Sequence, residues 1–157
     1  MRKLILFTFF NLLIVNLNAQ KASGTIKVSD ELTMTVTEMN KNYANNQHEL
    51  WDEKLSDDAK VYLNNTLTDG KTVKEVFRAH HTIFNDIQIN DVYTHTAYLK
   101  NGDTWTNNWF TWVGTGNKTG IRFSNRAHFD FKWENEKIVE MTCYFDNTAL
   151  NMELAAQ

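Results

Sequence analysis

The sequence has no proline, six glycines and one cysteine, Cys143, among its 157 residues. A single cysteine excludes an intramolecular disulfide, so the fold must be stabilised by packing. Clusters of positive charge are also missing, since the 16 Lys and Arg are interspersed with 19 Asp and Glu. Nucleic-acid binding depends on clustered Lys and Arg that neutralise phosphates, and we therefore expect no nucleic-acid partner.

Long apolar runs are absent from the sequence except near its start. Residues 4–15 are mostly apolar, follow Arg2 and Lys3, and precede a small residue, Ala19. This order is typical of a secretory signal peptide, and the run is shorter than the roughly 20 residues that cross a bilayer. We expect residues 1–19 to be a removable signal and residues 20–157 to form a secreted or periplasmic domain without a membrane span.

The mature chain has the size of one domain with a single core. Removing residues 1–19 leaves 138 residues, of which 14 are basic and 19 acidic, so the net charge is near −5. Seventeen aromatic residues remain. They are more than a core of this size needs, so some of them can line a cavity.

The first half of the mature chain has helical periodicity. Apolar residues recur at helical spacing behind Ser29 and Asp30, which can cap a helix, and a short second helix is predicted around Trp51. Residues 59–63 read as a strand. Thr72 and Glu75 have the spacing of a capping box, which predicts a third helix start. That helix would place these residues on one face: Val73, Val76, Phe77, His80 and Phe84.

The second half alternates like strands. Residues 87–99 and 104–113 are separated by a turn with Asn101 and Gly102, a strong hairpin signal. A third strand reaches Trp133 and a fourth spans 138–145, after which Asp146 can cap a last short helix. Helices followed by a strand meander predict an α+β fold.

Several segments resemble one family. They are residues 109–120, the stretch Lys137-Ile138-Val139-Glu140, and Tyr144-Phe145-Asp146 followed by Leu150. In this order they resemble the nuclear transport factor 2-like superfamily, in particular its SnoaL-like branch, over residues 30–154. The resemblance implies a cone-shaped α+β barrel, in which a curved antiparallel sheet wraps around N-terminal helices and encloses an apolar pocket. It also implies a homodimer formed through the outer sheet face.

The catalytic residues of two enzyme branches are missing at the positions that the resemblance indicates. Where SnoaL-like cyclases carry an aspartate and a facing histidine, this chain has Cys143 and Phe129. Where ketosteroid isomerases carry an aspartate, after Asp57-Asp58-Ala59, it has Leu63. A phenylalanine and a leucine cannot ionise, and an ordinary thiol is a poor acid or base near neutral pH. The resemblance therefore disfavours a standard cyclase or isomerase.

Strand alternation indicates which side chains line the pocket. Phe129, Phe131 and Trp133 share one face, which the resemblance makes concave, and His128 and Asp130 share the other. The same alternation groups Trp105 with Trp109 and Trp112 with Phe110 without telling which pair faces inward. The expected pocket residues are Tyr43, Phe84, Trp109, Phe129, Phe131, Trp133, Met141, Cys143 and Phe145, and Val139 is expected to share their face.

His80 is the candidate catalytic residue, because it lies on the apolar helix face and can act as a general base. The alternative is a structural role, in which His80 is a core histidine with one hydrogen-bonded ring nitrogen. Tyr62 or Tyr43 are candidates for a hydroxyl beside it. His80 and His81 cannot easily coordinate one metal ion together, because adjacent helical side chains diverge by about 100°, and we expect neither a metal nor a cofactor.

The sequence thus predicts an exported SnoaL-like pocket protein that binds a small apolar or aromatic molecule and forms a homodimer. Two alternatives remain open. One is a lyase, isomerase or hydrolase of the same superfamily that uses His80 with Tyr62 or Tyr43. The other is a dimeric interaction module with a filled cavity.

Overall fold

The computed structural model describes residues 24–156, so the predicted signal peptide lies outside the described residues. The described chain is α+β, with the expected order of helices first and a strand meander second. Its elements are β1 (Gly24–Lys27), α2 (Glu31–Ala44), α3 (Glu49–Lys54), β2 (Leu55–Leu63), β3 (Thr66–Asp69), α4 (Gly70–Ile83), β4 (Phe84–Leu99), β5 (Thr104–Gly116), β6 (Arg122–Glu134), β7 (Lys137–Phe145) and α5 (Thr148–Ala155). None of the helices among these residues is long and apolar enough to cross a membrane.

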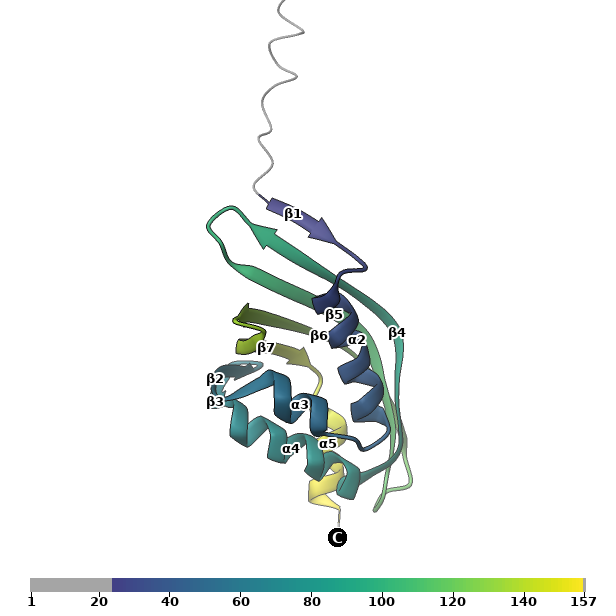
Figure 1. Cartoon of the computed structure of the whole chain (residues 1–157). Helices are drawn as coiled ribbons and strands as arrows, with labels where there is room; N and C mark the ends of the chain where they lie inside the picture. The colour runs from purple at the N-terminus through teal and green to yellow at the C-terminus, as the bar shows by residue number, and fades with distance from the viewer. Residues whose placement is uncertain (1–23, 157) are drawn as a thin grey trace, which may run out of the picture.

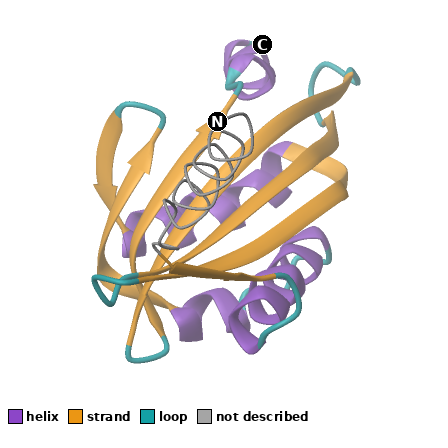
Figure 2. Ribbon diagram, turned by 90° about the horizontal axis from the view of Figure 1, so that it is seen from above, coloured by secondary structure: helices purple, strands orange, loops and turns teal. Residues whose placement is uncertain are grey.

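The strands of this region form one seven-stranded sheet, in the order β1-β4-β5-β6-β7-β2-β3. The long strands β4 and β5 bend, and α2, α3 and α4 lie against the concave side of the sheet (Figure 1). The strands twist across these helices in the view from above (Figure 2). Because β1 and β3 are edge strands, the sheet is an open, curved layer and does not close into a barrel.

The sheet is mixed, which corrects the expectation of a wholly antiparallel one. β2 runs parallel to β7, with Val61 opposite Met141 and Leu63 opposite Cys143. Parallel neighbours need a long crossover, and here nearly the whole sheet lies between them in sequence. No local pattern encodes such a pairing.

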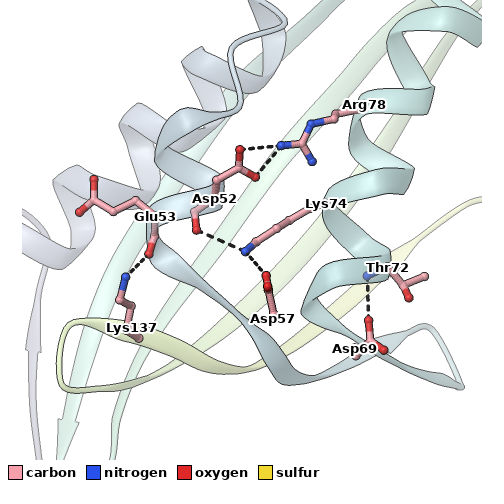
Figure 3. Close-up of polar contacts among 8 residues, drawn as sticks. All are labelled: Asp52, Glu53, Asp57, Asp69, Thr72, Lys74, Arg78 and Lys137. Atoms are coloured by element: carbon pink, nitrogen blue, oxygen red, sulfur yellow. Dashed lines mark hydrogen bonds and ion pairs between the residues drawn. The ribbon is translucent and has the colours of Figure 1, made fainter.

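Asp30 and Asp69 start the two long helices. Asp30 Oδ1 accepts a hydrogen bond from Thr33 N at 3.0 Å, which confirms the predicted cap of α2. Asp69 Oδ1 accepts one from Thr72 N at 2.7 Å (Figure 3), so α4 begins at Gly70. The predicted capping box at Thr72 is therefore wrong. Asp69 is an equally good cap three residues earlier, and the helix uses it.

The concave face carries the core, as the strand alternation and the family resemblance together predicted. Phe131, Met141 and Cys143 are fully buried, and Trp133 is nearly so. Val139 is the exception, because a register shift between Lys132 and Trp133 pairs Trp133 with Ile138. This bulge turns the buried Ile138 inward in place of Val139.

Two buried polar networks fasten α2 to the sheet. The hydroxyls of Thr33, Thr96 and Thr106 are linked at 2.9 Å each. The side-chain amides of Asn40 and Asn108 donate to each other at 3.2 Å, and Thr94 Oγ1 donates to Asn108 Oδ1 at 2.9 Å. Satisfied networks of this kind fix the position of a helix because each broken bond leaves a buried polar atom.

Candidate functional site

A cavity of about 260 Å³ lies between the concave face of the sheet and α2, α4 and α5. Aromatic and aliphatic side chains dominate its lining, and the ionisable ones are those of Tyr43, His80 and Asp146. The lining residues are Asn40, Tyr43, Trp51, Leu63, Val76, Phe77, His80, Phe84, Ile89, Phe110, Trp112, Asn125, Ala127, Phe129, Phe145, Asp146, Asn147, Ala149 and Leu150.

Charged side chains hold α4, and therefore His80, in place from the outside (Figure 3). Lys74 Nζ donates to Asp57 Oδ1 at 2.7 Å and to the carbonyl oxygen of Asp52 at 3.3 Å. Arg78 donates to both carboxylate oxygens of Asp52, at 2.6 and 2.5 Å. These contacts join α4 to α3 and β2, so the last turn of α4 meets the cavity in a fixed orientation.

Tyr43, His80 and Trp112 form a hydrogen-bonded chain inside the cavity. The Tyr43 hydroxyl lies 2.9 Å from His80 Nδ1, and Trp112 Nε1 donates to the same hydroxyl at 3.1 Å. The three residues come from α2, α4 and β5, and all three line the cavity. A histidine and a tyrosine hydroxyl thus converge at one point of a largely apolar site.

Burial keeps this chain uncharged near neutral pH. It lowers the pKa of His80 to about 4, with a smaller effect of the neighbouring His81. It also raises the pKa of Tyr43, although the hydrogen bond from Trp112 partly opposes the shift. Both groups are therefore neutral under physiological conditions, because the charged form of each is poorly solvated there.

The predicted pocket residues fall into three groups. Tyr43, Phe84, Phe129 and Phe145 line the cavity, as does the catalytic candidate His80. A second group is packed in the core of the concave face without lining the cavity, and it consists of Phe131, Trp133, Met141 and Cys143. The third group, Trp109 and Tyr62, lies on the other face of the sheet.

The prediction that Trp109 lines the pocket is wrong, because Trp109 is not among the lining residues. Its ring is stacked on that of His128, with centroids 4.1 Å apart and planes 10° apart. Trp112 and Phe110 are the members of the alternating pattern that face the cavity. Alternation relates these residues to one another, but the inward pair is set by the register with β6.

Tyr62 cannot act with His80. On β2 the inward residues are Val61, fully buried, and Leu63, which lines the cavity. Successive strand residues point to opposite faces, so Tyr62 faces outward, opposite Thr142 of β7. Tyr43 is the tyrosine that meets the histidine.

Trp112 and Asn40 are lining residues that were missed as pocket candidates. Trp112 belonged to a pair whose direction was open, and its role as donor to Tyr43 depends on tertiary contact. Asn40 follows Met39, a fully buried core residue of α2, and its amide is satisfied by Asn108 from β5. Such pairings between distant elements leave no sequence signal.

The outer face of the sheet carries a cross-strand row of rings. Tyr93, Trp109, His128 and Tyr144 are direct register partners on four neighbouring strands. His128 Nε2 lies 2.8 Å from Asp130 Oδ1, which puts both on the outer face as predicted. Tyr93 and Tyr144, at the two ends of the row, are more than half exposed. Of the neighbouring pairs, Trp109 and His128 stack, while Tyr93 is tilted against Trp109 and Tyr144 is tilted against His128.

Known structures share this fold at low sequence identity. IdmH of Streptomyces antibioticus, a proposed polyketide cyclase, matches with 16% identity and a TM-score of 0.59 over 81% of this chain and 100% of its own. An NTF2-like protein from Anabaena variabilis gives 18% and 0.59 over 73% and 86%. A proposed SnoaL-like polyketide cyclase from Jannaschia sp. CCS1 gives 12% and 0.59 over 88% and 99%.

No protein-family model and no curated protein sequence matches the chain. The structural matches nevertheless show that the chain has the NTF2-like fold of the SnoaL-like proteins. It is thus a pocket-bearing protein of that fold. Fold alone does not define its chemistry.

The cavity chemistry departs from the catalytic patterns that the resemblance implied. Leu63 and Phe129 line the cavity, and Cys143 is fully buried opposite Phe129 on β7. Burial raises the pKa of the Cys143 thiol, with a smaller contribution from Asp130, so the thiol stays protonated. Within residues 24–156, no three His, Cys, Asp or Glu side chains are grouped as metal ligands would be.

Proposed function

We propose that the protein is an exported binding protein whose cavity holds a small, uncharged, apolar or aromatic molecule. One observation carries the proposal: the lining is mainly aromatic and aliphatic, and the neutral Tyr43 and His80 form a hydrogen-bonded polar spot inside it. Small-molecule sites generally combine apolar walls with a few convergent polar groups. An anionic ligand would lose its hydration without gaining a cationic partner, because the lining residues include no Lys or Arg and His80 is neutral.

The cavity volume limits the size of the ligand. An apolar cavity of about 150 Å³ holds one benzene molecule. At about 260 Å³, this cavity accommodates a molecule with one or two rings. Phe77, Phe84 and Phe110 offer ring edges and faces for aromatic contacts.

Filling the cavity tests the proposal. Ala127 lines the cavity and is buried on β6, so Ala127→Phe places a ring inside it. Ala79→Phe adds the same ring on the exposed side of α4 and is the matched control. Calorimetric titration with ethylbenzene should show saturable binding to the parent and to Ala79→Phe but not to Ala127→Phe. Equal binding by all three proteins would mean that the probe binds elsewhere.

An enzyme is the second candidate, and the hydrogen bond between Tyr43 and His80 favours it. A neutral histidine can polarise a carbonyl group, as in the neutral electrophiles of known isomerases. Asp146 is the one carboxylate among the lining residues and is the candidate base. Exchange of the methyl protons of acetophenone in D₂O, followed by NMR, tests this reaction. The enzyme interpretation requires faster exchange with the parent than with His80→Phe.

Export and dimerisation complete the proposal. The basic, apolar and small order of residues 1–19 supports export, and N-terminal sequencing of exported material should begin at or near Gln20. Intact Met1 in a membrane fraction would contradict it. The row of rings from Tyr93 to Tyr144 supports a homodimer, because exposed aromatic groups are typical of interface centres.

A further inference from the structure

The hydrogen-bonded chain in the cavity has a direction. Trp112 Nε1 can only donate, so it must donate to the Tyr43 hydroxyl. The Tyr43 oxygen then accepts one bond and keeps its own proton. His80 Nδ1, 2.9 Å away, is the one other polar atom bonded to this hydroxyl within residues 24–156.

Satisfying every group fixes the tautomer of His80. If Tyr43 donates to His80 Nδ1, then the Trp112 N–H, the Tyr43 O–H and the Nδ1 lone pair are all used. If Nδ1 donated instead, the Tyr43 oxygen would accept two bonds and its proton would have no acceptor in a largely apolar site. Leaving a buried donor unsatisfied is unfavourable. The chain therefore runs from Trp112 through Tyr43 to His80, whose proton is on Nε2.

The Nε2–H group is the open end of this chain. His80 lines the cavity, and its Nε2 has no hydrogen-bond partner within residues 24–156. His80 Nε2 is also accessible, whereas His81 Nε2 is buried without a hydrogen-bond partner. An accessible N–H donor that has no protein partner, on a residue that lines the cavity, is available to a ligand.

We propose that His80 Nε2–H anchors the ligand by donating to a single acceptor oxygen, so that the ligand class is a ring compound bearing a carbonyl or ether group. This inference rests on the proposed function of the cavity. The donor selects acceptors, because a ligand that carried only a donor would leave two N–H or O–H groups facing each other. His80 also carries no charge to pair with a carboxylate ligand, since the low pKa of its ring keeps it neutral.

Two probes of similar size distinguish the hydrogen bond from His80 Nε2–H from apolar binding in the cavity. Acetophenone carries a carbonyl, and ethylbenzene is the same ring without an acceptor. Their affinities for the parent and for His80→Phe are measured by calorimetry. Because each probe loses the same hydration in both proteins, the change in the affinity ratio isolates the contact with His80.

The ratio should shift against acetophenone by about tenfold in His80→Phe, as expected for one hydrogen bond in a buried site. Ethylbenzene should bind both proteins alike, since phenylalanine preserves the ring. Tyr43→Phe should also reduce the preference, because it frees His80 to place its proton on Nδ1. Benzoate, the anionic probe, should bind the parent more weakly than acetophenone.

The tautomer has a readout that needs no ligand. In the parent protein, ¹⁵N NMR of the His80 ring should show a protonated Nε2 and an unprotonated Nδ1 near neutral pH. A protonated Nδ1 would overturn the proposal. If both probes bind and His80→Phe leaves their ratio unchanged, the anchoring role is wrong while the binding function stands. If neither probe binds the parent, the proposed function fails for ligands of this size.

Discussion

Cys143→Asp tests the dry interior of the concave face. Cys143 is fully buried on β7, with Phe129 opposite it on β6 and Leu63 opposite it on β2. An aspartate there would have no cationic partner among these neighbours, and Asp130 already opposes negative charge at this position. The carboxyl group would therefore be held in its protonated, neutral form in the folded state.

The magnitude follows from the pKa change. Full burial raises the pKa of a carboxyl group by up to about 3 to 5 units, from an ordinary value of about 3.9. At about pH 7, the pH lies roughly 3 units above the ordinary pKa, so only roughly 3 units of the shift affect stability. At about 1.36 kcal/mol per unit, they lower the free energy of unfolding by about 4 kcal/mol. A raised folded pKa means that the native state binds more protons. The loss is thus small below about pH 4 and grows as pH rises.

Urea unfolding of three variants measures this effect. Cys143→Asn has the shape of aspartate without its charge, and Cys143→Ala removes the sulfur for about 1 kcal/mol. The midpoint of Cys143→Asp should lie well below that of Cys143→Asn at about pH 7 and approach it at about pH 4. If the two variants unfold alike at both pH values, Cys143 is not in a dry apolar environment and our assignment of the concave face is wrong.

Three further predictions concern the frame of the cavity and the outer face. Asn108→Ala should cost about 2 to 4 kcal/mol in urea unfolding, because it strands the buried Asn40 amide; Asn40→Ala added to it should cost little more. Burial raises the pKa of Glu153, but hydrogen bonds from Thr119 and from the amides of Lys118 and Thr119 outweigh this and lower it. The stabilisation by Glu153 is therefore present above about pH 4.3 and lost as pH falls through the lower folded pKa. Glu153→Gln should accordingly reduce the fall of the thermal midpoint at acid pH. Light scattering at micromolar concentration should give a dimer for the parent and a monomer for Tyr144→Lys; a monomeric parent would contradict the proposed interface.

Local patterns predicted much of the fold because they reflect nearest neighbours along the chain. Alternation in residues 125–133 placed Phe129, Phe131 and Trp133 on one face, since a strand has a strict period of two, and the family resemblance made that face the concave one. The hairpin at Gly102 was predictable because Asn-Gly lies between two alternating runs. The φ of Gly102, 92°, is one that suits glycine. Asp30 capped α2 as expected.

What sequence could not supply were relations between distant segments. The parallel pairing of β2 with β7, the bulge that replaces Val139 by Ile138, and the inward choice of Trp112 over Trp109 all depend on register between strands. The same holds for the candidate site. His80 was identifiable from its helix face, but its partner Tyr43 lies 37 residues away in the sequence. Trp112, which donates to Tyr43, lies 69 residues from Tyr43.

Methyl NMR tests most directly whether the cavity is a binding site. Ala127 and Ala149 line it, whereas Ala79 is exposed on α4, so their labelled methyl groups report on different places. On titration with ethylbenzene, we predict saturable shifts of the Ala127 and Ala149 methyl signals and an unchanged Ala79 signal. Signals of Ala127 and Ala149 that stay unchanged up to the solubility limit of the probe would contradict it.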